Sequence, residues 1–281
     1  MAHVDLSNAA YWNEPCGTTR LEQLGISASL ETASSLAAFD AFFFEFYPYL
    51  DRHIPFADMR GKRVLEVGLG MGSVSERIAR SGADFAGLDI AQGPVDLVNA
   101  RLAKAGLPGG ARTGNILEAP FGDESFDHVV TIGCLHHTGD LARGLGEIRR
   151  LLKPGGTAVV MLYYAYSPKR WLLWPRATFR HYRKTRNDPG AIMAGTAEER
   201  AGYDRATDGS APPETVFTSK RQLRHLARDF SDVRIGLENL DTDLLLYPVS
   251  RPLRRLLRPW LLRIGGIVGI AVEDMYAVLR K

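Results

Sequence analysis

The sequence has few cysteines, little net charge and no long apolar run. Cys16 and Cys134 are the two cysteines in 281 residues, too few for a disulfide framework, and no Cys/His group has metal-ligand spacing, so we expect a reducing compartment and no metal centre. The apolar runs fall short of the roughly 18 to 20 residues that a membrane span needs, and the N-terminus does not resemble a signal peptide. The net charge of +3 does not indicate a nucleic-acid partner. These absences predict a cytoplasmic globular protein.

The composition, 45% hydrophobic and 24% charged, suits one sizeable core with an additional subdomain. Patterns along the chain divide it into four parts. Residues 1–60 predict an N-terminal helical cap or lid, and 61–163 a ligand-binding core. We expect residues 164–218 to form an inserted cap. Residues 219–281 should complete the core sheet and include a basic amphipathic segment.

The stretch KRVLEVGLGMGS, residues 62–73, predicts a ligand-binding turn. A β-run passes through Glu66 into three glycines on alternate positions, Gly68, Gly70 and Gly72. Glycine accepts positive φ and has no Cβ, so such a turn lets backbone N–H groups approach a ligand. The third glycine comes one residue too early for a dinucleotide fingerprint. Glu66 could accept hydrogen bonds from a cationic amino group but would be unfavourable beside a pyrophosphate. The alternative is an ordinary βα turn without a ligand.

Strand-like and helix-like runs alternate from residue 62 to residue 156, which predicts an α/β fold with a doubly wound, mostly parallel sheet. Asp89 ends the second strand about 20 residues after the glycines, where an acid accepts hydrogen bonds from both hydroxyls of a ribose. Ile90 could pack against the adenine. An acid at this position is shared by NAD enzymes and methyltransferases, so it does not choose between them. The expected strands are 63–67, 84–88, 111–116, 128–133, 157–163, 233–237 and 275–280.

The run VLEVGLGMGS, residues 64–73, resembles the first motif of the class I S-adenosylmethionine (SAM) dependent methyltransferases, in which an acid precedes Gly-x-Gly-x-Gly. Residues 126–140 and 147–163 resemble the branch that includes the ubiquinone and menaquinone methyltransferases. The resemblance is specific to the superfamily and not to a substrate. It implies SAM as the cofactor, a Rossmann-like seven-stranded sheet whose last strand is antiparallel between strands five and six, a helical cap and a small-molecule acceptor.

The resemblance also implies the cofactor-binding residues. In the family pattern the third strand is usually followed by Gly-Asp-Ala, whose Asp reaches the adenine amino group. Gly114, Asn115 and Ile116 stand there in this sequence, and the amide oxygen of Asn115 keeps an acceptor for that group. The expected cofactor-binding set is Glu66, Gly68, Gly70, Gly72, Asp89, Ile90, Asn115, Ile116 and Gly133.

His136 and His137 follow the fourth strand and should border the transferable methyl group. Methyl transfer from a sulfonium is an in-line displacement that sometimes needs a proton acceptor, and imidazole suits that role. His136 is the stronger candidate for a base or orienting group, and His137 is the weaker one. The alternative is that one histidine packs or caps the next helix and neither touches a proton. Asp140 is expected to cap that helix.

Aromatic residues recur at intervals of three and four between 36 and 50, which predicts an amphipathic helix ending near Pro48. These aromatics either pack on the core or line an acceptor pocket. The turn-rich stretch 11–19 predicts a loop or lid, and the long polar loop 202–214 within the insertion could lie over the site. The expected acceptor contacts are Tyr11, Trp12, Tyr163, Tyr203 and Asp208.

Residues 248–264, PVSRPLRRLLRPWLLRI, have apolar side chains at helical intervals with arginines mostly opposite. This pattern predicts either peripheral contact with an anionic membrane surface or a helix packed on the sheet with a solvated arginine face. The sequence leaves the oligomeric state open.

The hypothesis that follows is a SAM-dependent methyltransferase acting on an oxygen or nitrogen of a small organic acceptor. Methylation of carbon in a quinone-like or lipid acceptor is the alternative within the family. A nicotinamide-dependent oxidoreductase and a SAM-binding protein without catalysis are the alternatives from other classes.

Overall fold

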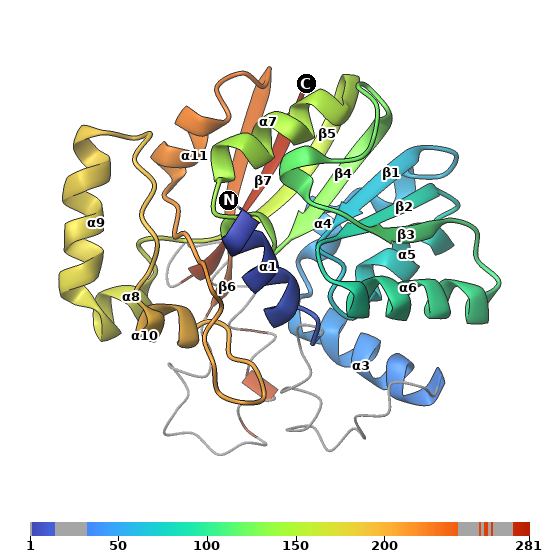
Figure 1. The fold of residues 1–281 in the computed structure, drawn as a ribbon, viewed down its shortest axis with the longest axis horizontal. Helices are drawn as coiled ribbons and strands as arrows, with labels where there is room; N and C mark the ends of the chain where they lie inside the picture. Colours follow the sequence, from blue (N-terminus) through green and yellow to red (C-terminus); the bar gives the residue numbers. More distant parts are fainter. Residues whose placement is uncertain (1, 15–32, 241–252, 254–255, 258–259, 261–271) are drawn as a thin grey trace.

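The computed structural model describes residues 2–14, 33–240, 253, 256–257, 260 and 272–281. A seven-stranded sheet runs through the described part in the order β3-β2-β1-β4-β5-β7-β6 (Figure 1). Strands β1 to β5 pair in parallel, and β7 is antiparallel to both of its neighbours, β5 and β6. This confirms the predicted mostly parallel sheet with an antiparallel last strand. The strands are β1 Arg63–Val67, β2 Asp84–Asp89, β3 Gly110–Thr113, β4 Phe126–Ile132, β5 Leu152–Tyr163, β6 Asp232–Leu240 and β7 Val272–Arg280.

Helices cover both faces of this sheet and one edge. The α-helices are α1 Ala2–Tyr11, α3 Ala33–Phe46, α4 Leu50–His53, α5 Ser73–Arg80, α6 Gln92–Ala105, α7 Leu141–Leu151, α8 Pro168–Leu173, α9 Pro175–Asn187, α10 Ala197–Ala201 and α11 Lys220–Leu226. Three short 3₁₀ turns join them, at η1 Phe56–Asp58, η2 Ile116–Glu118 and η3 Leu135–His137.

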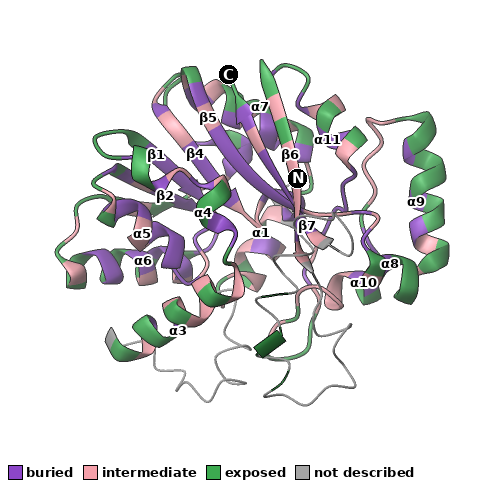
Figure 2. Cartoon of the chain, turned by 180° about the vertical axis from the view of Figure 1, so that it is seen from behind, coloured by how far each residue is buried: buried purple, intermediate pink, exposed green. Residues whose placement is uncertain are grey.

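Alternation along β1 shows how the sheet builds two cores. Leu65 packs into a cluster with Ile148 of α7 and Leu223 of α11, whereas its neighbour Val64 packs into a second cluster with Ile78 of α5. Successive side chains of a strand point to opposite faces, so a strand covered on both sides reads as a continuous apolar run. The buried strands therefore lie between two helical layers (Figure 2).

Capping side chains fix several helix starts. The carboxylate of Asp140 accepts a hydrogen bond from the backbone N–H of Arg143 at 3.0 Å, which confirms its predicted role at the start of α7. Thr196 and Ser219 form capping boxes at α10 and α11. Each cap satisfies backbone donors that a helix end would otherwise leave without partners.

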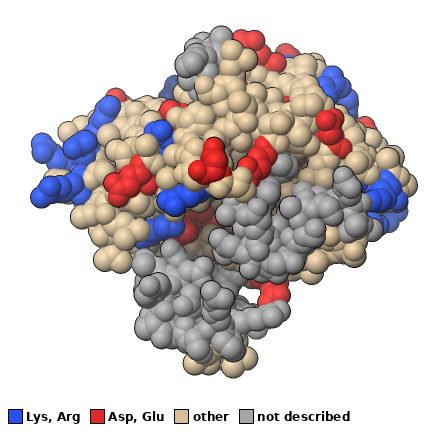
Figure 3. All heavy atoms as spheres, turned by 60° about the horizontal axis from the view of Figure 1, so that its bottom comes forward, with Lys and Arg blue, Asp and Glu red and all other residues tan. Residues whose placement is uncertain are grey.

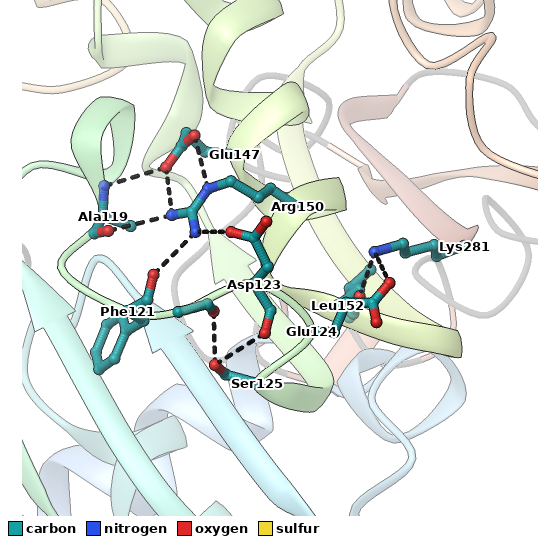
Figure 4. A network of polar contacts seen from close by, with 10 residues as sticks. Ala119, Phe121, Asp123, Glu124, Ser125, Glu147, Arg150, Leu152 and Lys281 are labelled. Carbon is teal, nitrogen blue, oxygen red and sulfur yellow. Dashed lines mark hydrogen bonds and ion pairs between the residues drawn. The ribbon is translucent and has the colours of Figure 1, made fainter.

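Arg150 of α7 fastens the segment between η2 and β4 (Figure 4). Its guanidinium forms ion pairs with Glu147 at 2.8 Å and Asp123 at 2.7 Å, and it donates to the carbonyls of Ala119 and Phe121. A guanidinium carries five donors in a rigid fork, so one side chain can hold several points of an irregular loop. This loop follows directly after the predicted adenine-contacting residues.

A buried ion pair holds two helices of the cap insertion together. Arg170 of α8 lies 2.6 Å from Glu199 of α10, with 2% and 3% of the two side chains exposed, and its guanidinium stacks over the Phe217 ring. The neighbouring helix α9 is strongly basic, and Lys and Arg side chains gather at the end of the molecule where it lies (left in Figure 3).

Some predicted boundaries differ from the structure. The aromatic helix ends at Phe46, as predicted near Pro48, but Leu50, which was counted in its pattern, begins a separate helix, α4, because Pro48 interrupts the helix. The third strand ends at Thr113, and the fifth already begins at Leu152. The predicted lid 11–19 lies partly outside the described residues, and so does most of the amphipathic segment 248–264, of which Leu256 and Trp260 are exposed. Among the described helices, none combines the length and the apolar character needed to cross a bilayer.

Candidate active site

A pocket of about 470 Å³ opens at the carboxyl ends of the central strands. Its lining divides into two parts that come from different regions of the chain. The cofactor half is lined by the glycine turn, the ends of β2 and β4, and the residues after β3. The acceptor chamber, as we call the other part, is lined by Asn8, Trp12, His137, Tyr163, Lys169, Tyr203, Asp204, Asn239, Glu273 and Asp274.

The three glycines of the turn have different steric roles. All have positive φ, at 80° for Gly68, 49° for Gly70 and 77° for Gly72. A Cβ on Gly68 would lie 2.4 Å from the Cβ of Cys134, whereas a Cβ on Gly70 would meet nothing within 4 Å. Gly68 is therefore required by the packing of the turn on the end of β4. Gly70 leaves open the space in which a ligand would approach the backbone.

Glu66 lies at the end of β1 with 3% of its surface exposed and accepts a hydrogen bond from the hydroxyl of Ser75. Burial raises the pKa of this carboxyl from 4.5 to about 8, and the charge of Asp89 adds to the shift. A buried carboxylate gains most from a cationic partner. Glu66 therefore suits an ammonium group that a ligand brings into the pocket.

Asp89 is held by the backbone at the end of β2. Its Oδ2 accepts the N–H of Leu69 at 2.7 Å, and its Oδ1 accepts the N–H of Ala91 at 2.9 Å. Each carboxylate oxygen has a further lone pair for another donor, so the predicted contact with two ribose hydroxyls is compatible with these bonds. Ile90, the next residue, also lines the pocket.

Asn115 and Ile116 line the pocket beyond β3, and Gly133 lines it beyond β4. The Oδ1 of Asn115 accepts the N–H of Leu117 at 2.9 Å and so caps η2. This bond orients the amide, and the second lone pair of Oδ1 is the acceptor that would serve an adenine amino group. All nine predicted cofactor-binding residues lie in the pocket lining.

Of the two histidines, the prediction favoured His136 as a base, but it is His137 that lines the pocket. His136 is completely buried and is not part of the pocket lining, whereas His137 is. The His136 ring packs with its centroid 4.1 Å from His137 and 4.3 Å from Tyr163, and burial lowers its pKa well below 6.5. A single 3₁₀ turn turns successive side chains about 120° apart, so the two neighbours cannot both face the pocket. This placement favours His137 over His136 as the candidate base.

His137 has a defined tautomer. Its Nδ1 lies 2.7 Å from the carbonyl oxygen of Glu214, which can only accept, so Nδ1 carries the hydrogen and Nε2 has a lone pair. That Nε2 lies 3.5 Å from Oδ2 of Asp204, and the hydroxyl of Tyr163 donates to the same oxygen at 2.8 Å. Burial lowers the pKa of His137 and raises that of Asp204. The pair is arranged to take up and hold a proton.

Asp204 was not predicted, and two residues that were predicted lie elsewhere. Asp208 is exposed and accepts the N–H of Ser210 at 2.8 Å, because its loop turns outward after Asp204. Tyr11 is not part of the pocket lining. Its ring packs edge-on against Trp12 with the centroids 4.8 Å apart, so it supports Trp12. The signal that could have identified Asp204 was its position beside Tyr203 in the same polar loop.

Some of the aromatic side chains of α3 line the pocket. Of the two roles predicted for them, Phe39 and Phe43 combine both, since they belong to or pack against apolar clusters and also line the cavity. Phe46 and Tyr47 line it as well. The pocket wall opposite the sheet is therefore largely aromatic.

One group of side chains in the described part of the chain could be considered for a metal ion. Single ligand atoms of His136, His137 and Asp204 lie within 4.8 Å of one another. Ligands bound at about 2.0 to 2.1 Å from a zinc ion lie about 3.4 Å apart in a tetrahedral site. The spread of this group is wider, and the arrangement matches a proton-transfer pair better than a metal centre.

Comparison with known proteins identifies the family. Residues 65–160 match the family model described as a methyltransferase domain. These residues form a methyltransferase domain, which supports the predicted class I SAM-dependent methyltransferase superfamily. The domain implies SAM as the cofactor, and the open space at Gly70, the buried carboxylate of Glu66 and the fixed carboxylate of Asp89 fit this ligand.

The relatives of this chain are named for different acceptors. It is 38% identical to 24-methylenesterol C-methyltransferase 2 of rice, Oryza sativa subsp. japonica, over 38% of this chain and 29% of the relative. It is 31% identical to ubiquinone biosynthesis O-methyltransferase of Azorhizobium caulinodans, over 36% of this chain and 40% of the relative. The chain thus spans less than half of the length of these curated relatives.

A solved structure shares the fold. The phospholethanolamine N-methyltransferase 2 of Haemonchus contortus, in complex with phosphomonomethylethanolamine and S-adenosylhomocysteine, has a TM-score of 0.52. The identity is 18%, over 84% of this chain and 52% of that one. The methyltransferase match favours the predicted family over a nicotinamide-dependent oxidoreductase.

Proposed function

We propose that this methyltransferase transfers a methyl group from SAM to an oxygen or nitrogen of a small organic acceptor. The observation that carries the proposal is the lone pair on His137 Nε2, which has no hydrogen-bond donor among the described residues and lies 3.5 Å from Oδ2 of Asp204. Both residues line the pocket. A carbon acceptor activated without a base would make no use of this arrangement. A SAM-binding protein without catalysis would not need it either.

The bound cofactor supplies an electrophilic methyl group on a sulfonium. The residues of the chain have three roles around it. Glu66 and Asp89 hold polar parts of the cofactor, and the aromatic wall excludes water from the chamber. His137 accepts a proton from the acceptor atom, and the carboxylate of Asp204 stabilises the imidazolium that forms.

Comparison of two histidine variants tests the proposal. With SAM carrying a labelled methyl group and a metabolite extract as the source of acceptors, His137→Ala should lower turnover by about 10²- to 10⁴-fold and leave the affinity for SAM unchanged. His136→Ala should instead lower the melting temperature, while the folded fraction turns over at a rate close to that of the parent. His225→Ala, in the last turn of α11, is the control outside the pocket.

The pH dependence gives a second readout. Since burial lowers the pKa of His137 from 6.5, the rate should begin to fall at a lower pH than it would with an ordinary histidine as the base. Normal turnover by His137→Ala, or methylation in no extract at all, would overturn the proposed function.

The binding partners of the protein and its contact with membranes stay predictions. The acceptor is a small molecule, and no nucleic-acid partner is proposed. Peripheral membrane contact through residues 248–264 stays a prediction, because most of that segment lies outside the described residues. Sedimentation with anionic vesicles would test it.

A further inference from the structure

The acceptor chamber presents hydrogen-bond acceptors to its ligand. The Oδ1 of Asn8 and the Nε2 of His137 are buried and have no hydrogen-bond partner within the described residues, and both side chains line the pocket with 4% of their surface exposed. The amide of Asn8 is oriented by its Nδ2, which donates to the carbonyl oxygen of His137 at 2.7 Å. Burying an acceptor without a donor is costly. Asn8 Oδ1 and His137 Nε2 would therefore each be stabilised by a hydrogen-bond donor that a bound ligand supplies.

Carboxylates add negative charge to the same chamber. Asp204, Glu273 and Asp274 all line it, and Lys169 is the one lysine or arginine among the described lining residues. Lys169 forms an ion pair with Glu273 at 3.0 Å. If all three carboxylates are ionised, they carry three negative charges against the one positive charge of Lys169, and the chamber has a net charge of −2.

Neutral groups orient the other two carboxylates. Tyr163 donates to Asp204, as described above, and Asp274 receives hydrogen bonds from Asn239 at 2.9 Å and from the hydroxyl of Tyr49 at 3.4 Å. Asp274 is 1% exposed and forms no ion pair with a lysine or arginine of the described chain. The carboxylates are close enough for Asp204 and Glu273 to raise the pKa of Asp274, to which burial contributes most. A cation between them would relieve this repulsion.

The chamber wall already accommodates one ammonium group. The Nζ of Lys169 lies 4.5 Å from the centroid of the Tyr203 ring, beside the Tyr163 ring, whose centroid is 4.7 Å from that of Tyr203. Aromatic faces attract cations most strongly where water is excluded. The same wall, with Asp204 and Asp274, offers a second ammonium both aromatic and carboxylate contacts.

We infer that the acceptor of this methyltransferase is an amine, bound in its ammonium form. It lies between the carboxylates of Asp204 and Asp274 and the rings of Tyr163 and Tyr203. The inference rests on the proposed function and narrows it from oxygen or nitrogen to nitrogen. The bound ammonium passes one proton to His137 Nε2, and the lone pair that this frees forms the new C–N bond. The C–S bond breaks with its electron pair left on sulfur, and the methylated product keeps the positive charge. His137 then releases its proton to solvent.

Three probes of nearly equal size test the recognition of charge. Benzylamine is a cation, benzyl alcohol is neutral and benzoate is an anion at pH 7, and each is titrated into protein saturated with S-adenosylhomocysteine. Benzylamine should bind most tightly and raise the melting temperature most, and benzoate least. Equal effects of all three probes, including none, or a preference for benzoate would overturn the inference.

A variant links this preference to the chamber. Asp274→Asn should weaken benzylamine roughly 10- to 100-fold, the size expected for a hydrogen bond to a charged group, and leave benzyl alcohol unchanged. Asp229→Asn makes the same change of charge at an exposed position after α11 and should change neither. If Asp274→Asn fails to fold, the titrations of the three probes into the parent protein still test whether the chamber prefers a cation.

Turnover separates the two proposals. After reaction with labelled SAM, an extract is first freed of unreacted SAM, which is itself a cation, and is then fractionated by cation exchange. The label transferred to product should appear in the retained fraction. Label only in neutral or anionic products would overturn the amine inference and support the proposed function. Absence of label from every fraction, with SAM bound normally, would overturn the proposed function.

Discussion

Binding of SAM should release protons, because Glu66 is protonated before the ligand arrives. With a pKa of about 8, this carboxyl is about 90% protonated at pH 7. An opposite charge within hydrogen-bonding distance lowers a carboxyl pKa by roughly 1 to 3 units, so binding of the cofactor's ammonium should release about 0.4 to 0.9 protons from Glu66. The amino group of the ligand, with an ordinary pKa of about 7.7 to 8.0, takes up about 0.1 to 0.2 in return.

Calorimetry in buffers with different ionisation enthalpies measures this release as the slope of the binding enthalpy. Glu66→Gln should keep the hydrogen bond to Ser75 and remove the release, which leaves the small uptake and reverses the sign of the slope. Glu118→Gln, with a side chain 75% exposed, is the control and should behave as the parent. A parent protein whose slope equals that of Glu66→Gln would refute the reasoning.

The same group should make the free protein less stable as the pH rises. The folded pKa of Glu66 lies above its ordinary value, so the folded state disfavours the ionised form. The contribution of Glu66 to the free energy of unfolding is therefore most favourable below pH 4.5 and decreases as the pH rises to about 8. The loss is roughly 3 kcal/mol at pH 7 from these two values. Glu66→Gln should therefore raise the melting temperature of the free protein at pH 7 and raise it much less at pH 5.

Three further predictions concern the site. Asp89→Ala should weaken SAM and S-adenosylhomocysteine by about 1 to 3 kcal/mol in calorimetry, and unchanged affinity would remove Asp89 from the site. Gly70→Val should fold and lose SAM binding, whereas Gly68→Ala should lower the melting temperature because its Cβ would overlap Cys134; tight SAM binding by Gly70→Val would contradict the assignment of the open space. Treatment with EDTA should leave turnover unchanged, and activity restored by a divalent metal would show that His136, His137 and Asp204 hold an ion.

The cofactor half could be predicted from the sequence because its signals are local. Glu66, the glycines and Asp89 each stand at the end of a strand, and parallel strands bring their carboxyl ends to one edge of the sheet. A glycine turn also fixes its own geometry through positive φ. Such features need no knowledge of distant contacts.

The acceptor chamber could be predicted only in part. Trp12, Tyr163 and Tyr203 were identified as aromatic residues near the site, but Asn8 and Asp274 were not. These two come from the first helix and the last strand, and their proximity depends on the pairing of β7 between β5 and β6. The choice between His136 and His137 depended on the direction of one 3₁₀ turn, which two adjacent identical residues cannot reveal.

The antiparallel direction of β7 has a consequence for how the specificity of this enzyme can change. Because β7 runs against its neighbours, its first residues, including Asp274, lie at the edge where the parallel strands end. Apart from His137, Tyr163 and Asn239, the chamber draws on α1 with the adjoining Trp12, on the insertion and on the start of β7, while the cofactor half draws on residues 66–133. Substitutions in the first group can alter the acceptor without disturbing the cofactor contacts. Laboratory evolution towards new acceptors can thus be confined to libraries in α1, residues 164–218 and the start of β7, with the motif around Gly70 held constant.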